Sequence, residues 1–89
     1  MFILTEYGTI ANLDNMIAIY QDNPKPNAKY HNILADFVKL EREITLASFK
    51  SEDQSEKAIR YIAGRLSRPD STDQIINMEN VKGIITDQG

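Results

Sequence analysis

The chain has 89 residues, of which 42% are hydrophobic and 26% are charged, and its net charge is −3. This length allows one domain with one modest core, and the mildly acidic balance argues against a protein dedicated to coating nucleic acid, because phosphate contacts need a basic surface. The sequence has no cysteine, which excludes disulfide bonds and thiolate metal sites and is compatible with a reducing cytosol.

The first part of the chain predicts short strands separated by turns. Residues 2–5, of which the first three are apolar, predict a first strand. Gly8 lies in the turn after it, where glycine can take a positive φ. Residues 9–12 predict a short second strand or a continuation of the first. The apolar run over residues 16–20 predicts a strand with apolar side chains on both faces, and therefore a central one.

A hairpin is predicted next. Residues 22–27 contain two prolines and predict an exposed loop. Residues 30–40 predict a strand, and Glu41 and Arg42 turn the chain into a further strand. This last strand, over residues 43–49, is rich in β-branched and apolar residues.

A capped helix follows this strand directly. Ser51 with Gln54 three residues later has the form of a capping box, in which each side chain satisfies a backbone N–H of the first turn. The helix is predicted to run to Ser67, and Pro69 stops it. Its apolar face, expected to pack on one side of the sheet, consists of Ala58, Ile59, Ile62, Ala63 and Leu66.

The segment after Pro69 is polar up to Gln74 and apolar again after it. It is either a last strand or an arm that reaches a partner. Residues 12–19 resemble residues 77–84, since an Asn-acid-Asn turn precedes an apolar run in each; this favours the strand and indicates shared turn chemistry. The residues expected to contact a partner or a second copy are Ile76, Met78, Val81, Ile84 and Ile85.

Together these elements predict an α+β fold, a small and mainly antiparallel sheet of four to five strands with one helix packed on one face. Residues 1–68 form this domain, and residues 69–89 are a C-terminal extension. The predicted sheet has two apolar faces, and one helix covers only one of them. We therefore expect the tail or another subunit of a homo-oligomer to cover the second face.

No pattern predicts catalysis. The one histidine, His31, lies near the start of a strand without an identifiable acid or nucleophile beside it. The closest carboxylates, Glu41 with Glu43 and Glu52 with Asp53, flank a turn and begin a helix. The sequence has no glycine-rich phosphate loop and no nucleophile elbow. We expect no catalytic residue, no metal site and no cofactor, and hence not an enzyme.

One surface of the predicted helix is basic. From residue 57 to residue 68 the chain has no acidic residue, and the basic side chains fall opposite the apolar face at roughly 100° per residue. They either bind a phosphate, a nucleotide, nucleic acid or an acidic protein, or they complement the helix dipole at its C-terminal end. An aromatic residue among them keeps the binding hypothesis open. The candidate binding residues are Lys57, Arg60, Tyr61, Arg65 and Arg68.

Three elements resemble small uncharacterised proteins encoded by Firmicutes and their phages. They are the apolar N-terminal strand, the turn at residues 12–15 before an apolar strand, and the segment with Glu43-Ile-Thr-Leu, Phe49, Ser51-Glu52 and Ala58. The resemblance covers residues 1–67 and brings no catalytic or binding residue with it. It implies a phage or prophage accessory protein, a class that commonly acts by binding something, including components of host defence.

We therefore expect a non-enzymatic binding or regulatory protein that acts stoichiometrically on a protein partner and forms a homo-oligomer. Two alternatives remain, a module that sequesters a small phosphorylated ligand on the basic helix face, and a structural subunit of a virion or larger complex. A cytoplasmic location is expected, in the host cell if the protein is phage-encoded, because the apolar start at residues 1–4 is too short for a signal peptide. The longest apolar run is too short to span a bilayer.

Overall fold

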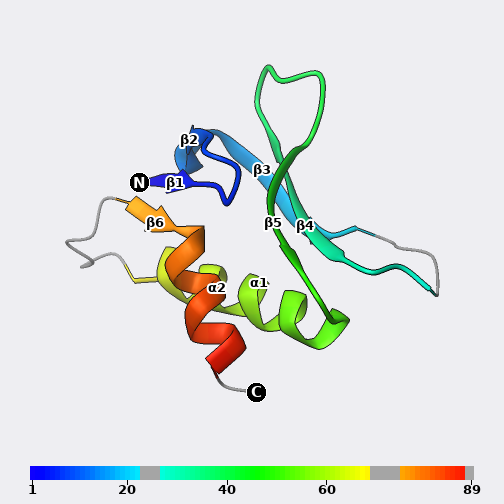
Figure 1. Ribbon diagram of the computed structural model, residues 1–89. Helices are drawn as coiled ribbons and strands as arrows, with labels where there is room; N and C mark the ends of the chain where they lie inside the picture. The colour runs from blue at the N-terminus through cyan, green and yellow to red at the C-terminus, as the bar shows by residue number, and fades with distance from the viewer. Residues whose placement is uncertain (23–26, 69–74, 88–89) are drawn as a thin grey trace.

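The computed structural model describes residues 1–22, 27–68 and 75–87. Within these residues the chain forms two three-stranded sheets and two α-helices (Figure 1). The predicted α+β class is confirmed. The sequence did not predict the second helix or the division of the strands between two sheets.

The smaller sheet joins the two ends of the chain. Its central strand, β1 (Phe2–Leu4), pairs antiparallel with β2 (Ile10–Asn12) and parallel with β6 (Ile75–Asn77). The turn between β1 and β2 contains Gly8 at a φ of 88°, a left-handed conformation that glycine adopts without strain. The predicted turn is therefore confirmed, and β2 is a separate strand.

The larger sheet is antiparallel, with the strand order β3-β4-β5. A short 3₁₀ helix, η1 (Leu13–Asn15), leads from β2 into β3 (Met16–Gln21). The strands β4 (His31–Phe37) and β5 (Ile44–Phe49) follow. They form the predicted hairpin, although β4 is shorter than expected and ends before residue 38.

The prediction that residues 16–20 form a central strand is wrong, because β3 lies at the edge of the sheet and β4 lies in its middle. Met16 and Ile19 pack against the core, whereas Ile17 and Tyr20 are exposed. The run has apolar residues on both faces, but the described residues cover only one face of this sheet. An apolar run of this kind indicates a central strand only where both faces are buried.

The first helix, α1 (Glu52–Leu66), begins at the predicted residue, and the Ser51 half of the predicted capping box is confirmed. Ser51 is its N-cap, and the backbone N–H of Gln54 donates to the Ser51 Oγ at 3.2 Å. This bond satisfies one of the N–H groups that the first turn of a helix leaves without a partner.

The buried face of α1 is rotated from the predicted one. Ser55, Ala58 and Ile62 are buried, whereas Ala63 and Leu66 are exposed. Ser55 is tolerated in the core because its hydroxyl lies 2.8 Å from a backbone carbonyl oxygen one turn earlier and 2.9 Å from the side-chain oxygen of a glutamine on β3. Ser55 could not be predicted as a core residue, because the hydrogen-bond partners of its hydroxyl are known only from the structure.

The second helix, α2 (Met78–Asp87), occupies most of the segment for which a last strand was expected. The strand is confined to β6, and the chain is helical from Met78 onward. Met78, Val81 and Ile85 are buried at helical spacing. The β-branched residues of this segment favour a strand, but burial of this face determines the helix.

The two Asn-acid-Asn turns share one hydrogen bond. The Asn12 Oδ1 accepts from the backbone N–H of Asp14 at 2.9 Å, and the Asn77 Oδ1 accepts from that of Glu79 at 3.0 Å. Each asparagine ends a strand of the smaller sheet and precedes a helix, η1 or α2. The shared turn chemistry predicted from the sequence is confirmed, although the apolar residues that follow belong to a strand in one case and a helix in the other.

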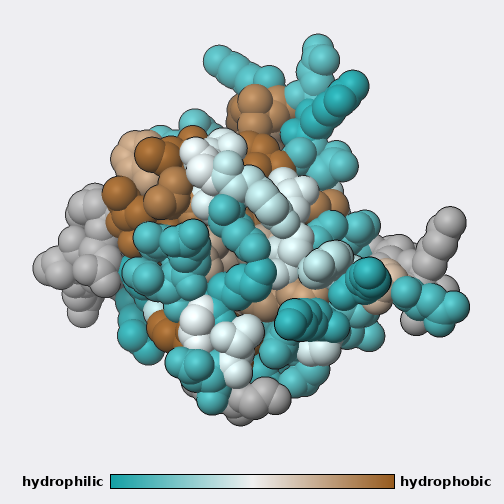
Figure 2. Space-filling model, viewed as in Figure 1, coloured by the Kyte–Doolittle hydropathy of each residue, from teal (hydrophilic) through white to brown (hydrophobic). Residues whose placement is uncertain are grey.

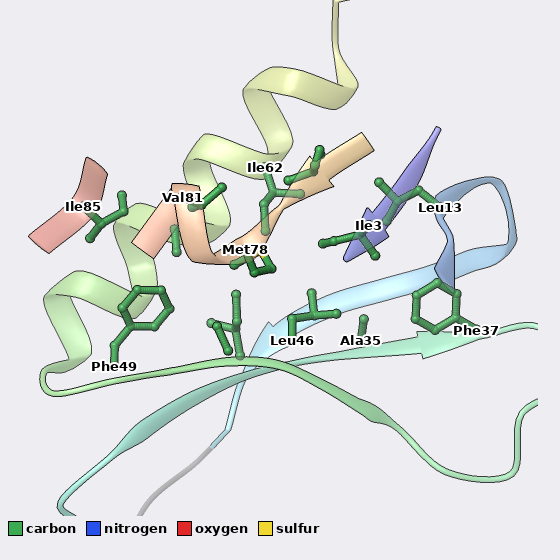
Figure 3. Close-up of a cluster of buried hydrophobic side chains, with 14 residues drawn as sticks. Ile3, Leu13, Ala35, Phe37, Leu46, Phe49, Ile62, Met78, Val81 and Ile85 are labelled. Carbon is green, nitrogen blue, oxygen red and sulfur yellow. The ribbon is translucent and has the colours of Figure 1, made fainter. Parts of the chain in front are cut away.

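One core lies between the larger sheet, the two helices and the inner face of the smaller sheet (Figure 3). In Figure 3, Phe49 and Leu46 of β5 lie below Met78 of α2 and Ile62 of α1. Ile3 of β1, Leu13 and Phe37 lie toward the other end of the core. The described part of the predicted extension therefore shares the core of residues 1–68. Most of the predicted proline loop and Pro69 lie outside the described residues. Neither described helix has the length and apolar character needed to cross a membrane.

Candidate functional site

Most of the predicted binding residues, on α1 and just after its end, line a shallow cavity of about 250 Å³. Four of the five predicted residues line it together with Gly64, and only Lys57 does not. They meet because residues three, four and seven positions apart share one face of a helix. The four are Arg60, Tyr61, Arg65 and Arg68.

Part of this positive charge is paired along the helix. The Arg60 guanidinium lies 2.6 Å from the Glu56 carboxylate, and the Lys57 ammonium lies 3.2 Å from that of Asp53. Pairs of this spacing stabilise a helix by about 0.3–0.5 kcal/mol. Tyr61 is half-buried and packs against the core. These contacts give Lys57, Arg60 and Tyr61 a structural role, and they support the helix-dipole alternative for this face.

The five tail residues expected to contact a partner have two different environments. Four lie in the core of their own chain and are at most 3% exposed, namely Ile76, Met78, Val81 and Ile85. The fifth, Ile84, is 42% exposed. Among the five, Ile84 is therefore the residue that another chain can reach without opening the core.

The outer face of the smaller sheet is apolar and uncharged. Side chains alternate along a strand, so six residues share the face opposite the core: Phe2, Leu4, Ile10, Asn12, Ile75 and Asn77. Ile10 is 63% exposed, Ile75 51% and Phe2 42%. In the described part of the chain both helices pack on the core side of the molecule, and neither covers this face.

A groove of about 340 Å³ continues this face toward the connection between β4 and β5. One wall consists of residues 9–12, with Asn15 beside them, and the other of Phe37, Val38, Leu40 and Ile44. None of these residues is charged. Figure 2 shows apolar surface over β1 and β2 and at the base of the β4–β5 connection. We call the six outer-face residues and this groove together the uncharged apolar surface.

The surplus apolar face predicted from the sequence therefore lies on the smaller sheet. The outer face of the larger sheet is more polar. There Tyr20 donates to the Asp36 carboxylate at 3.2 Å, and Ser48 donates to Asn32 at 2.5 Å. The sequence did not predict which strands carry the uncovered apolar face, because it predicted one sheet and not two.

A further cavity was not predicted from the sequence. A polar cavity of about 440 Å³ lies beside β5, lined by Glu6, Tyr7, Tyr30, Ser48, Lys50 and Lys82. These residues come from distant parts of the chain, so no local spacing connects them. The contact between the β1–β2 turn and β5 and the position of α2 bring them together.

His31 is the first residue of β4, and its Nδ1 is buried with no hydrogen-bond partner among the residues that the structure describes. Over residues 1–22, 27–68 and 75–87, no three side chains of His, Cys, Asp or Glu lie close enough together to hold a metal ion.

No protein-family model matches the chain, and no curated protein or solved structure is significantly similar to it.

Proposed function

We propose that this protein acts by stoichiometric binding of other protein chains, not by catalysis, and that the uncharged apolar surface is the contact. The observation that carries the proposal is the outer face of the smaller sheet, where Phe2, Ile10 and Ile75 are between 42% and 63% exposed. Charged residues are depleted from the centres of protein interfaces, and contiguous exposed apolar patches mark such interfaces.

The first partner that we propose is a second copy of this chain. A surface without formal charge meets its own copy across a two-fold axis without like-charge repulsion. Two such sheets can pack face to face, as the two layers of a β-sandwich do. Nucleic acid is a poor fit to this surface, because none of its residues can neutralise a phosphate.

The expected affinity follows from the area that this contact removes from water. Five large side chains of the surface are about half exposed, namely Phe2, Ile10, Val38, Leu40 and Ile75. Burying the exposed part of each contributes roughly 1 kcal/mol, and a two-fold contact buries both sets, so the gain is on the order of 10 kcal/mol. Association costs about 4–15 kcal/mol. We therefore expect a dimer of moderate affinity that dissociates on dilution.

Ile10→Asp is expected to convert this dimer to a monomer. The substitution leaves the core untouched and places a carboxylate in the apolar contact on each copy, a cost of several kcal/mol that weakens association at least about 100-fold. Sedimentation velocity over a range of concentrations measures the effect. Ile17→Asp is the matched control, because Ile17 is 67% exposed on β3 outside this surface.

We expect the wild-type chain and Ile17→Asp to dimerise and Ile10→Asp to sediment as a folded monomer. A wild-type chain that stays monomeric at high micromolar concentration, or an Ile10→Asp chain that still dimerises, contradicts the proposal. Species much larger than a dimer favour instead the structural subunit of a larger complex.

The same surface also suits an apolar patch of another protein. The resemblance to phage proteins suggests a component of the host, including its defence, as that target. By covering the target's apolar patch, this surface then inhibits the target without catalysing a reaction. One chain or one dimer binds each target molecule.

A ligand-sequestering function is the second candidate, and the cavity on α1 favours it. The guanidinium groups of Arg60, Arg65 and Arg68 are suited to the oxygens of a phosphate ester. Arg60 already contacts Glu56, so an anion at this cavity competes with an ion pair. This competition makes α1 the weaker of the two candidates.

A further inference from the structure

We infer that the polar cavity beside β5 is a second binding site, for a small ligand that joins an aromatic ring to an anionic group, as a nucleoside monophosphate does. The inference is independent of the uncharged apolar surface and goes beyond the proposed function. It depends on which groups of the cavity are already engaged and which remain available.

The wall of the cavity is held by the turn between β1 and β2, which lies along the edge of β5 (Figure 1). The backbone N–H of Glu6 donates to the carbonyl oxygen of Leu46 at 2.9 Å. In return, the backbone N–H of Ser48 donates to the Glu6 Oε2 at 2.9 Å. These two bonds fix the turn, and with it Tyr7, relative to the sheet.

Each oxygen of the carboxylate in the cavity accepts a hydrogen bond. The Glu6 Oε1 accepts from the Lys82 Nζ at 2.6 Å, and its other oxygen accepts from Ser48. The Lys82 ammonium also lies 5.8 Å from the centroid of the Phe49 ring, within the range of a cation–π contact. Lys82 therefore neutralises Glu6 and is held in place, while an ammonium group still has further N–H donors.

A second ammonium group gives the cavity a net positive charge. Lys50 lines it and forms no ion pair with any residue that the structure describes. With Glu6 neutralised by Lys82, the charge of the cavity is that of Lys50. Among the described residues, an anionic group of a ligand in this cavity therefore meets one unpaired cation and no unpaired acid.

The hydroxyl groups of the cavity have defined donor and acceptor roles. Ser48 donates its one proton to the Asn32 Oδ1 at 2.5 Å. The Tyr7 hydroxyl, which is hydrogen-bonded to the Ser48 Oγ, must therefore donate to it. The lone pairs of the Tyr7 oxygen remain available as acceptors, and its ring is held at the cavity. Tyr30, 58% exposed, supplies a second ring.

These groups define the ligand. Ammonium groups bind the oxygens of phosphates, and tyrosine rings stack on planar bases. The cavity volume lies within the range of about 300–1,000 Å³ typical of small-ligand sites. A free nucleotide and single-stranded nucleic acid share this chemistry. The net charge of −3 favours the free nucleotide, because a nucleic acid needs several phosphate contacts.

The test is isothermal titration calorimetry of the full chain with adenosine monophosphate. We expect saturable binding, and binding at least about tenfold weaker for adenosine alone and for inorganic phosphate alone, since each lacks one of the two contacts. Lys50→Ala and Tyr30→Ala each change an exposed side chain, so both should remain folded by circular dichroism. Each should weaken binding of adenosine monophosphate at least about tenfold.

Arg60→Ala is the control, because it removes a residue of the α1 cavity and leaves the cavity beside β5 intact. Unchanged affinity in Arg60→Ala supports the inference, and a loss there instead of in Lys50→Ala overturns it. Absence of binding to the wild-type chain, equal binding of inorganic phosphate, or tighter binding of a short oligonucleotide also overturns it. Ile10→Asp retains this cavity, so its nucleotide affinity separates a failure of this inference from a failure of the dimer.

Discussion

Phe49→Ala is expected to lower the free energy of unfolding by about 3–5 kcal/mol. Phe49 ends β5 and is 1% exposed, and Figure 3 shows its ring below Val81 and Ile85 of α2. Truncation removes the ring that joins the larger sheet to this helix and leaves a cavity that the rigid sheet cannot close. Domains are typically stable by about 5–15 kcal/mol, so the loss is a large part of the total.

Urea denaturation followed by circular dichroism measures this loss. Ile17→Ala is the control, because its side chain is 67% exposed and we expect a change within about 0.5 kcal/mol. If Phe49→Ala costs no more than Ile17→Ala, α2 does not pack on β5 as described.

Ile76→Ala is expected to cost about 2–5 kcal/mol. Ile76 is fully buried on β6, and this strand pairs in parallel with β1. The substitution therefore weakens the contact that joins residues 75–87 to the start of the chain.

Ile84→Ala is the matched control, with the same chemical change in the same segment but at a position 42% exposed. We expect the cost of Ile84→Ala to be well below that of Ile76→Ala in the same denaturation experiment. Equal and small effects are instead the result expected for an arm that leaves its own chain. The pair of variants thus distinguishes the two alternatives that the sequence left open for the tail.

Local signals predicted those elements whose hydrogen bonds close within a few residues. The cap at Ser51, the turn at Gly8 and the asparagine turn at Asn12 are all confirmed. In each case the side chain or the backbone freedom of one residue satisfies a neighbouring group, so no information from the rest of the chain is needed.

The arrangement of the strands depends on distant residues and could not be predicted in this way. β1 pairs with residues 75–77, and no local pattern in either segment specifies a parallel partner. The edge position of β3 is similar, because exposed apolar residues such as Ile17 resemble the outer face of a buried strand. The division into two sheets follows from η1, which separates β2 from β3.

The candidate sites also differ in whether local sequence spacing could predict them. The basic residues of α1 were predicted because they lie on one helix, where spacing alone determines which side chains meet. The cavity beside β5 combines Glu6, Ser48 and Lys82, which only the tertiary structure brings together. Tyr7 comes after β1 and Tyr30 directly before β4, and both are exposed. These two aromatic residues outside the strands were the signal in the sequence that could have indicated the cavity.

We propose that chains contact one another through the uncharged apolar surface. Isotope-filtered NOE spectroscopy on a mixture of labelled and unlabelled chains detects this contact residue by residue. We expect intermolecular NOEs from the methyl groups of Ile10 and Ile75 to the ring of Phe2 or to side chains of the groove. Intermolecular NOEs confined to α1, or none under conditions where sedimentation shows a dimer, would contradict the claim.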